Sequence, residues 1–192
     1  QQISASVDMD QVLDIVVNLT GELVDASFTA LSLVDENKDV LFLASLAPGG
    51  IPSSNVPWQA KLLELMDQIK KSGKVGYVAD VAEMRSKDPQ SPWVTYMEER
   101  GVVSAWATPL TDEEGVLGVL WMESDEVKFM SGNSADMVSI LATQATVSLR
   151  NASLFHQIPF ADVLGKMGKK GKKWASGWRR ISLAAVLAVS VG

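Results

Sequence analysis

The chain of 192 residues contains no cysteine and only one histidine, His156. Without thiols it can form no disulfide, zinc–thiolate site or iron–sulfur cluster, and no thioether link to a haem or a pigment. A single histidine also excludes a metal site built from several histidines of one chain. We therefore expect neither a metal nor a cofactor.

Positive charge is scarce in most of the chain and concentrated near its C-terminal end. Residues 1–159 contain 10 Lys and Arg against 22 Asp and Glu, whereas residues 160–192 contain 7 basic residues and one acid. The formal net charge of −6 argues against general nucleic-acid binding. The division of charge indicates that residues 160–192 have a different partner from the rest.

Long hydrophobic runs are absent until residues 181–192, which carry no charge. This run is shorter than the roughly 20 apolar residues that a membrane-spanning helix needs. Basic and tryptophan residues directly before an apolar run are typical of a cytoplasmic membrane boundary. Here these membrane-flanking residues are Lys169, Lys170, Lys172, Lys173, Trp174, Trp178, Arg179 and Arg180.

We accordingly predict a folded domain over residues 1–157, a basic juxtamembrane linker over 158–180 and the start of a truncated transmembrane helix over 181–192. The domain would lie at the cytoplasmic face of the inner membrane, with its C-terminal segment entering that membrane. Two alternatives for the tail are an amphipathic surface helix and a basic nucleic-acid-binding segment.

The hydrophobic periodicity predicts an α+β domain. Helices are expected over 8–24, 57–72, 93–100 and 134–155, and extended segments over 28–35, 39–46, 75–82, 102–110 and 115–123. Residues 83–92 are polar and contain prolines, so we expect a loop there. Turns of hairpin length favour a mainly antiparallel sheet of about five to six strands over a doubly wound parallel one.

Several motifs lie in a fixed order in the second half of the domain. They are Pro109-Leu110, the Gly-x-x-Gly-Val-Leu strand of residues 115–120, Phe129, and Asn151-Ala152 followed by Leu154. This half resembles the C-terminal half of a GAF domain, and the order of elements extends the resemblance over residues 8–155. It implies that the first and last helices pack on one face of the sheet, and that short helices and loops cover a pocket on the other.

Three ligand classes of that family fit this sequence poorly. Cyclic-nucleotide-binding members often carry a Phe-x-x-x-Asp-Glu run, but Phe129 is followed at that spacing by Asn133 and Ser134. Pigment-binding members use a cysteine, which is absent. Haem binding would need an axial ligand, and His156 lies beyond the last predicted helix.

Aromatic residues fall on the elements that surround the pocket in GAF-like folds. The candidate ligand-binding residues are Phe42, Trp58, Trp93, Tyr96, Ser104 and Trp106. Strand alternation places Ser104 and Thr108 on the same face as Trp106, where they could supply polar contacts. The alternative interpretation is an ordinary core, because aromatic side chains dominate the buried area of any core.

Two glycines of the Gly-x-x-Gly strand have separate expected roles. Gly115 suits a turn that needs positive φ, and Gly118 in mid-strand would let a helix backbone approach closely. The acidic turn Asp112-Glu113-Glu114 is interpreted as solvated charge, because calcium sites place their oxygens at alternate positions.

We predict a non-enzymatic sensory or regulatory domain of a membrane-anchored protein, such as a membrane-fusion (periplasmic adaptor) protein of a secretion or efflux system. It would bind a small ligand, or pair with a second copy through its first and last helices, and bind no nucleic acid. Ile140 and Val147 form a second apolar facet on the last helix, which favours a parallel homodimer. The alternative function is a ligand-free structural dimerisation module.

Overall fold

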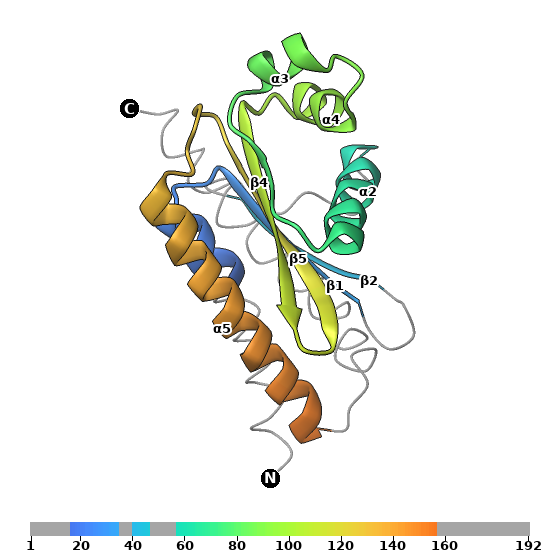
Figure 1. The fold of residues 1–192 in the computed structure, drawn as a ribbon, viewed down its shortest axis with the longest axis vertical. Helices are drawn as coiled ribbons and strands as arrows, with labels where there is room; N and C mark the ends of the chain where they lie inside the picture. The colour runs from blue at the N-terminus through green and yellow to red at the C-terminus, as the bar shows by residue number, and fades with distance from the viewer. Residues whose placement is uncertain (1–15, 35–39, 47–56, 157–192) are drawn as a thin grey trace, which may run out of the picture.

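A computed structural model of the chain describes residues 16–34, 40–46 and 57–156 (Figure 1). After a helical segment at 16–23, its elements are β1 (Phe28–Val34), β2 (Val40–Leu46), α2 (Pro57–Ser72), β3 (Gly76–Val78), α3 (Val81–Lys87), α4 (Pro92–Arg100), β4 (Ser104–Asp112), β5 (Gly115–Ser124) and α5 (Gly132–His156). The sheet forms a central layer between α5 on one side and α2 with α4 on the other. The predicted α+β class is confirmed.

Within the described residues the sheet has five strands in the order β2-β1-β5-β4-β3, and every neighbouring pair is antiparallel. The first and last hairpins, β1–β2 and β4–β5, meet at the centre because β1 pairs with β5. Gly115 closes the β4–β5 turn at φ 124°, the positive φ that its place in the sequence predicted. The antiparallel sheet and its number of strands therefore agree with the sequence-based expectation.

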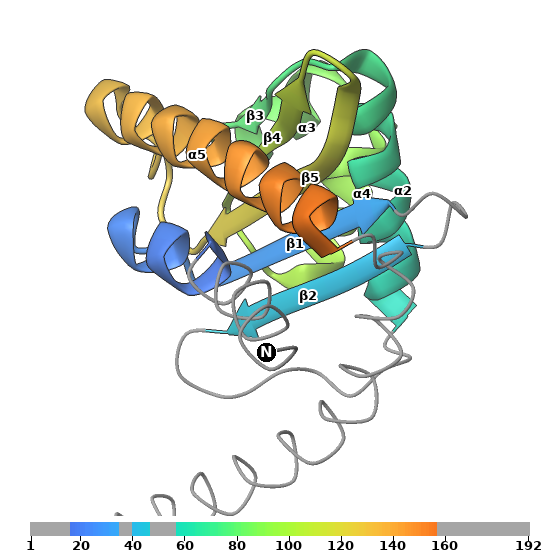
Figure 2. The ribbon, with the colours of Figure 1, turned by 90° about the horizontal axis from the view of Figure 1, so that it is seen from below.

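One face of the sheet is covered by α5 and the helical segment 16–23, which lie side by side (Figure 2). Helix α5 places Val138, Ala142, Ala145 and Leu149 in the core at intervals of three or four residues. These small and medium side chains let the helix pack closely on Leu120 and Met122 of β5 and their neighbours. The first and last described helices thus share one face, as expected.

Helices α2 and α4 cover the opposite face. Each begins with a proline, Pro57 or Pro92, whose missing N–H would have had no partner in the first turn. A glycine with positive φ follows each helix, Gly73 at 62° and Gly101 at 70°. The core of this side gathers Leu62, Leu65, Met66 and Ile69 from α2, Tyr96 and Met97 from α4, and Trp121 from β5.

Helix α3 occupies part of the segment that was expected to be a loop. Its side chains include none that is buried, so no apolar stripe identified it in the sequence. Asp80 is its N-cap and accepts a hydrogen bond from the backbone N–H of Ala82 at 2.8 Å. The loop prediction for residues 83–92 is therefore wrong over 83–87, because the Asp80 cap and the partial burial of Val81 and Met84 against the core support a helix there.

Gly118 permits a close approach, but the approaching backbone belongs to a strand. A Cβ at this position would lie 2.2 Å from the carbonyl oxygen of Ser32 and 2.6 Å from Leu33 Cδ2. Both atoms belong to β1, which pairs with β5 at this point. The expectation of a helix backbone against Gly118 is therefore wrong: the central strand pair requires the glycine.

Several predictions fall outside the described residues. They include the Phe42 side chain, the linker over 158–180, its basic and tryptophan residues, and the apolar run 181–192. Among the helices in the described ranges, none has the length and hydropathy to cross a membrane.

Candidate ligand-binding site

Trp58, Trp93 and Tyr96 lie on the same side of the sheet, as the sequence predicted. Trp93 stacks on Trp121 with ring centroids 4.7 Å apart, and Tyr96 meets Trp121 edge-on at 5.6 Å. Trp58 contacts Phe28 edge-on at 5.7 Å. These aromatic pairs connect α2 and α4 to β1 and β5, so the rings occupy much of the space between the helices and the sheet.

Ser104 and Trp106 lie on the other side. Trp106 packs against the core beneath α5, and its ring meets that of Tyr77 at 5.1 Å. The Ser104 hydroxyl donates a hydrogen bond to the carbonyl oxygen of Glu126. The expected convergence of Trp106 and Ser104 with Trp58 and Trp93 is therefore wrong, although strand alternation correctly placed Ser104 and Trp106 on one face.

A buried carboxylate forms the polar centre of the α2–α4 side. Glu123 has an exposed fraction of 0%, and its Oε1 accepts hydrogen bonds from the Tyr96 hydroxyl and, at 2.8 Å, from Trp121 Nε1. Its Oε2 accepts a hydrogen bond of 3.0 Å from Arg100 Nη2. Three donors from two elements thus surround one fully buried negative charge.

Burial raises the pKa of Glu123, because it penalises the charged form. The Arg100 guanidinium acts against this rise, as do the hydrogen bonds from Tyr96 and Trp121. The pKa of Tyr96 is raised well above its ordinary value, by burial first and then by the neighbouring carboxylate. Tyr96 is therefore a neutral hydrogen-bond donor to Glu123.

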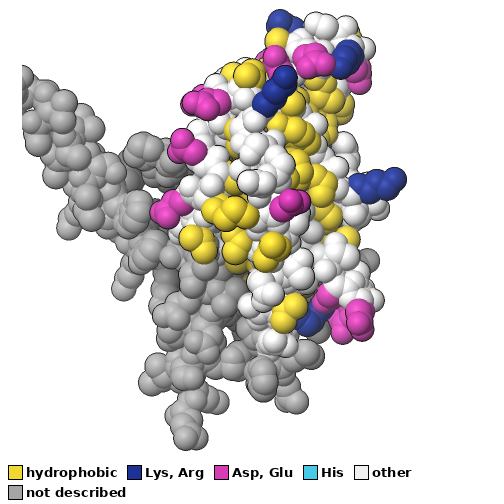
Figure 3. All heavy atoms as spheres, turned by 60° about the vertical axis from the view of Figure 1, so that its left-hand side comes forward, with side chains coloured by type: hydrophobic (Ala, Val, Ile, Leu, Met, Phe, Trp, Pro, Cys, Tyr) yellow, Lys and Arg dark blue, Asp and Glu magenta, His cyan; other side chains and the backbone are white. Residues whose placement is uncertain are grey.

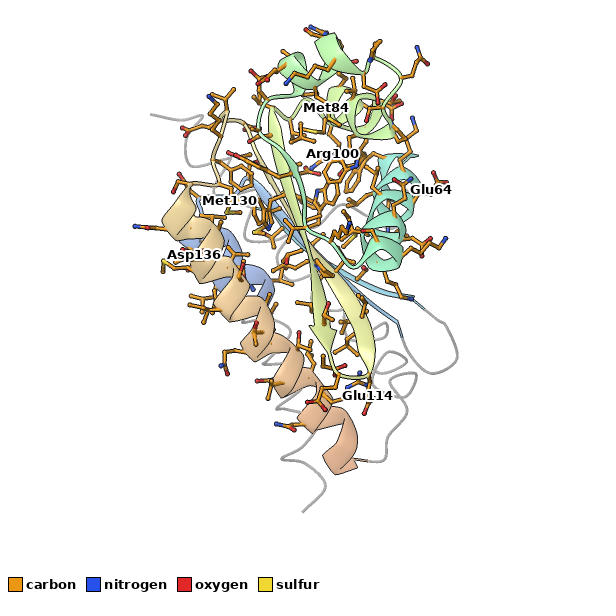
Figure 4. The ribbon with its side chains drawn as sticks, viewed as in Figure 1. Glu64, Met84, Arg100, Glu114, Met130 and Asp136 are labelled. Atoms are coloured by element: carbon orange, nitrogen blue, oxygen red, sulfur yellow. The ribbon has the colours of Figure 1, made fainter. Side chains whose placement is uncertain are left out.

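Arg100 at the end of α4, labelled in Figure 4, connects this buried centre to the rings of Trp58 on α2 and Phe28 on β1. Its guanidinium carbon lies 4.2 Å from the ring centroid of Trp58 and 5.0 Å from that of Phe28. Its side chain is 17% exposed. Arg100 Nε is buried and has no hydrogen-bond partner among the described residues. One buried donor of Arg100 thus lies beside two aromatic rings with no partner among the described residues.

The acidic β4–β5 turn is only partly solvated. Arg150 of α5 donates two hydrogen bonds to Asp112, of 2.7 and 3.2 Å, and its Nη1 lies 3.1 Å from Glu114 Oε2. The hydrogen bond from Arg150 holds the pKa of Asp112 below its usual range. Two of the three acids therefore join the hairpin to α5. Across the described ranges, no group of His, Asp and Glu could hold a metal ion.

A shallow groove of about 230 Å³ lies between β4 and α5. It is lined by Val75, Thr108, Pro109, Thr111, Ser139, Ala142, Thr143 and Thr146. The hydroxyls of Ser139, Thr143 and Thr146 donate to carbonyl oxygens of α5 itself. The groove therefore presents few free donors, and it lies on the opposite side of the sheet from Arg100.

Sequence analysis missed Arg100, Glu123 and Arg150. Glu123 had a recognisable signal, because it follows Trp121 by two positions and so shares its buried face in a regular strand. A charged residue at such a position requires a partner of opposite charge. Arg100 and Arg150 had no such signal, since each is a polar residue near the C-terminal end of a predicted amphipathic helix.

The fold is shared with solved structures of low sequence identity. GAF3 of Slr1393 from Synechocystis sp. PCC6803, in its photoproduct state, superposes with a TM-score of 0.63 at 14% identity, covering 78% of this chain and 98% of that one. The GAF domain region of a proposed membrane protein from Geobacter sulfurreducens PCA gives 0.60 at 18% identity, covering 77% and 97%. A fragment of a methyl-accepting chemotaxis protein gives 0.57 at 17% identity, covering 78% and 93%.

A family model described as the GAF domain matches residues 6–150. No curated protein matches the chain significantly. The matched range contains every described element of the sheet and most of α5. With the antiparallel sheet between two helical layers, it shows that this chain belongs to the GAF domain family, a family of ligand-binding or signalling modules.

Proposed function

We propose that this chain is a non-enzymatic sensory domain that binds a small ligand beside Arg100 and transmits its state through α5. The observation that carries the proposal is the buried Nε of Arg100, which has no hydrogen-bond partner among the described residues and belongs to a guanidinium that lies over the rings of Trp58 and Phe28. A ligand with a planar group and a hydrogen-bond acceptor would suit both the aromatic faces and this donor. Trp58 and Arg100 lie on α2 and α4, so a bound ligand would contact both helices.

We expect a compound of this kind to stabilise the full chain. Screening nucleotides, amino acids and carboxylic-acid metabolites by thermal shift tests this directly. A ligand present at 100 times its dissociation constant adds about 2.7 kcal/mol to the free energy of unfolding, which is a rise of several degrees in Tm for a domain of this size. Tryptophan emission should change with it, because Trp58 would lose contact with solvent.

The controls separate this site from the rest of the surface. Trp58→Ala should raise the ligand concentration needed for a given shift in Tm at least tenfold. Val147→Ala, at an exposed position of α5, should leave that concentration unchanged. Absence of a shift with every compound, or a shift equally strong in Trp58→Ala, would contradict the proposed site.

The membrane anchor is part of the same proposal. The basic residues before residue 181, together with the uncharged run after it, favour attachment of the domain to the cytoplasmic face of the inner membrane. The likeness to the GAF region of a proposed membrane protein supports this interpretation. A membrane-fusion protein of a secretion or efflux system is one class of protein that would combine these parts.

We expect the full chain to bind vesicles that contain phosphatidylglycerol more tightly than vesicles of phosphatidylcholine alone. Each basic residue near an anionic surface contributes about 1 kcal/mol, so removing three weakens binding about 100-fold. Flotation of the variant with Lys170→Gln, Lys172→Gln and Lys173→Gln measures this. The matched control carries Lys70→Gln, Lys71→Gln and Lys74→Gln at the end of α2, and equal losses in both variants would contradict a membrane role for the linker.

A second candidate function is a ligand-free dimerisation module. It is favoured by the extent to which Trp93, Tyr96 and Trp121 occupy the predicted pocket, and by the exposed apolar residues of α5. Under this alternative, Arg100 and Glu123 only stabilise the core. The ligand screen distinguishes the two functions, because a structural module would show no ligand-dependent shift.

A further inference from the structure

Strand β4 is longer than its outer neighbour β3. It runs from Ser104 to Asp112, but β3 pairs only with its residues 105–107. Among the described residues, 108–112 therefore pair with β5 on one side and have no strand on the other. Pro109 lies in this stretch and agrees with an edge position, because proline has no N–H to give to a neighbouring strand. We call residues 108–112 the open β4 edge.

The groove between β4 and α5 lies along the open β4 edge. Its β4 wall is formed by Thr108, Pro109 and Thr111, and its α5 wall by Ser139, Thr143 and Thr146. The exposed fraction of Thr108 is 5%, yet its hydroxyl makes no hydrogen bond to another described residue. A buried hydroxyl of this kind requires a further hydrogen-bonding group, so the groove lacks a partner among the described residues.

The two walls define the chemistry of that partner. The hydroxyls of Ser139, Thr143 and Thr146 donate to carbonyl oxygens of α5 at 2.8–2.9 Å, so they present only oxygen lone pairs to the groove. None of the residues that line the groove is charged. The open β4 edge presents backbone groups of a strand. An extended peptide with N–H donors and small uncharged side chains complements both walls.

The chain itself supplies a segment of this kind directly after α5. The helix ends at His156, about 15 Å beyond Thr146 along the helix axis. An extended chain advances about 3.3 Å per residue, so a chain that turns back after α5 reaches the level of Thr146 after roughly five residues and that of Ser139 after roughly eight. The returning residues are Phe160-Ala161-Asp162-Val163-Leu164. Alternation in a strand places Ala161 and Val163, both small and uncharged, on one face.

The direction of a returning segment is the one that this sheet uses. Asp112, the last residue of β4, accepts hydrogen bonds from Arg150 near the end of α5. Strand β4 and helix α5 therefore run in the same direction (Figure 1). A segment that returns from the end of α5 lies antiparallel to β4, like every pair of neighbouring strands among the described residues.

The charges beyond the groove also favour this segment. Lys166, Lys169 and Lys170 follow residue 164. Asp136 lies on the same side of α5 as Thr143, seven residues before it, and is the acidic residue labelled near the start of α5 in Figure 4. Figure 3 shows acidic side chains on the side of the molecule that carries α5. A segment that passes through the groove toward the start of α5 thus brings lysines to an acidic surface.

We propose that residues 160–164, which follow the described part of the chain, dock antiparallel on the open β4 edge with Ala161 and Val163 in the groove. This inference goes beyond the proposed function and depends neither on a ligand nor on a membrane. Docking holds the first lysines of the linker beside the domain. Because those lysines are then unavailable to an anionic surface, docking opposes membrane attachment.

The absence of cysteine makes a direct test possible. We expect the full-length double variant Thr143→Cys/Val163→Cys to form an intramolecular disulfide under mild oxidation at least tenfold faster than Gln144→Cys/Val163→Cys. Positions 143 and 144 are both exposed, and their separations from 163 along the chain differ by one residue. Their side chains point about 100° apart around the helix. A free tail closes both loops at the same rate, whereas a docked segment meets only position 143.

Hydrogen exchange of the unmodified full chain gives a second measurement. Amides of residues 160–164 that pair with β4 should exchange at least tenfold more slowly than those of an unstructured chain. Equal disulfide rates at the two positions, or unprotected amides over 160–164, overturn the inference. Disulfides between two chains indicate that the groove takes this segment from a second copy, which also overturns it. Unchanged thermal melts of the variants under reducing conditions will confirm that they fold, and the ligand proposal keeps its own thermal-shift test.

Discussion

Replacing Arg100 with methionine is expected to lower the free energy of unfolding by about 3–5 kcal/mol at pH 8, because it leaves the Glu123 carboxylate buried without its counter-charge. Glu123 has an exposed fraction of 0%, and Arg100 supplies its only basic partner among the described residues. Methionine keeps much of the apolar contact with Trp58 and Phe28, so the loss should mainly report the charge. Urea denaturation at controlled pH measures it.

The loss should be smaller at pH 5 than at pH 8. Burial already raises the pKa of Glu123 in the folded state, and removal of the Arg100 charge raises it further. A carboxyl group with a raised folded-state pKa binds protons more tightly when folded than when unfolded. The contribution of such a group to stability is therefore fully present below its pKa in the unfolded state. It is lost as pH rises through its pKa in the folded state. Protonation at pH 5 removes part of the uncompensated charge.

The double variant Arg100→Met/Glu123→Gln is the control for this mechanism. Because it removes both charges and keeps the size of the Glu123 side chain, it should be more stable than Arg100→Met alone at pH 8. Its stability should also depend less on pH. If the single and double variants lose the same free energy at both pH values, an uncompensated Glu123 charge is not the cause.

Replacing Trp121 with alanine is expected to cost about 3–5 kcal/mol of stability, because it opens a cavity beneath two other aromatic rings. Trp121 has an exposed fraction of 0% and contacts both Trp93 and Tyr96. The cavity would match an indole ring, so free indole should recover part of the lost stability in a concentration-dependent way. Thermal melts of Trp121→Ala with and without indole measure both effects.

Trp106→Ala is the matched control on the other face of the sheet. Trp106 is only partly buried, so this variant should lose less stability and gain nothing from indole. The variant Trp121→Phe retains a ring and loses the hydrogen bond from Trp121 Nε1 to Glu123, which should cost about 1–3 kcal/mol. Equal losses from Trp121→Ala and Trp106→Ala would contradict the assignment of Trp121 to the more tightly packed core.

Much of the fold was predictable because its determinants are local. The apolar spacing of α2 and α5, the prolines that begin α2 and α4, and the glycines that follow those helices are all readable along the chain. The hairpin turns, Gly115 among them, indicated antiparallel neighbours. Helix α3 was missed because only Val81 and Met84 contact the core and none of its side chains is fully buried.

The candidate site was only partly predictable. Trp58, Trp93 and Tyr96 were found because large aromatic residues on the expected elements have few places to pack other than the core. Trp106 was assigned to the wrong side, since alternation relates residues within a strand but does not say which face meets which helix. Arg100 and Glu123 belong to separate elements, and their ion pair depends on how α4 lies against β5.

The sequence by itself determined the order of the elements, the antiparallel hairpins, the exclusion of thiol chemistry and the exposed apolar facet of α5, because each depends on residue type and short-range spacing. Only the tertiary structure decided which aromatic rings meet, that Glu123 is buried against Arg100, and that Gly118 accommodates the backbone of β1 rather than a helix. These features arise from contacts between residues far apart in the chain. Their geometry depends on how the two helical layers pack against the sheet, and short-range spacing in the sequence does not specify that packing.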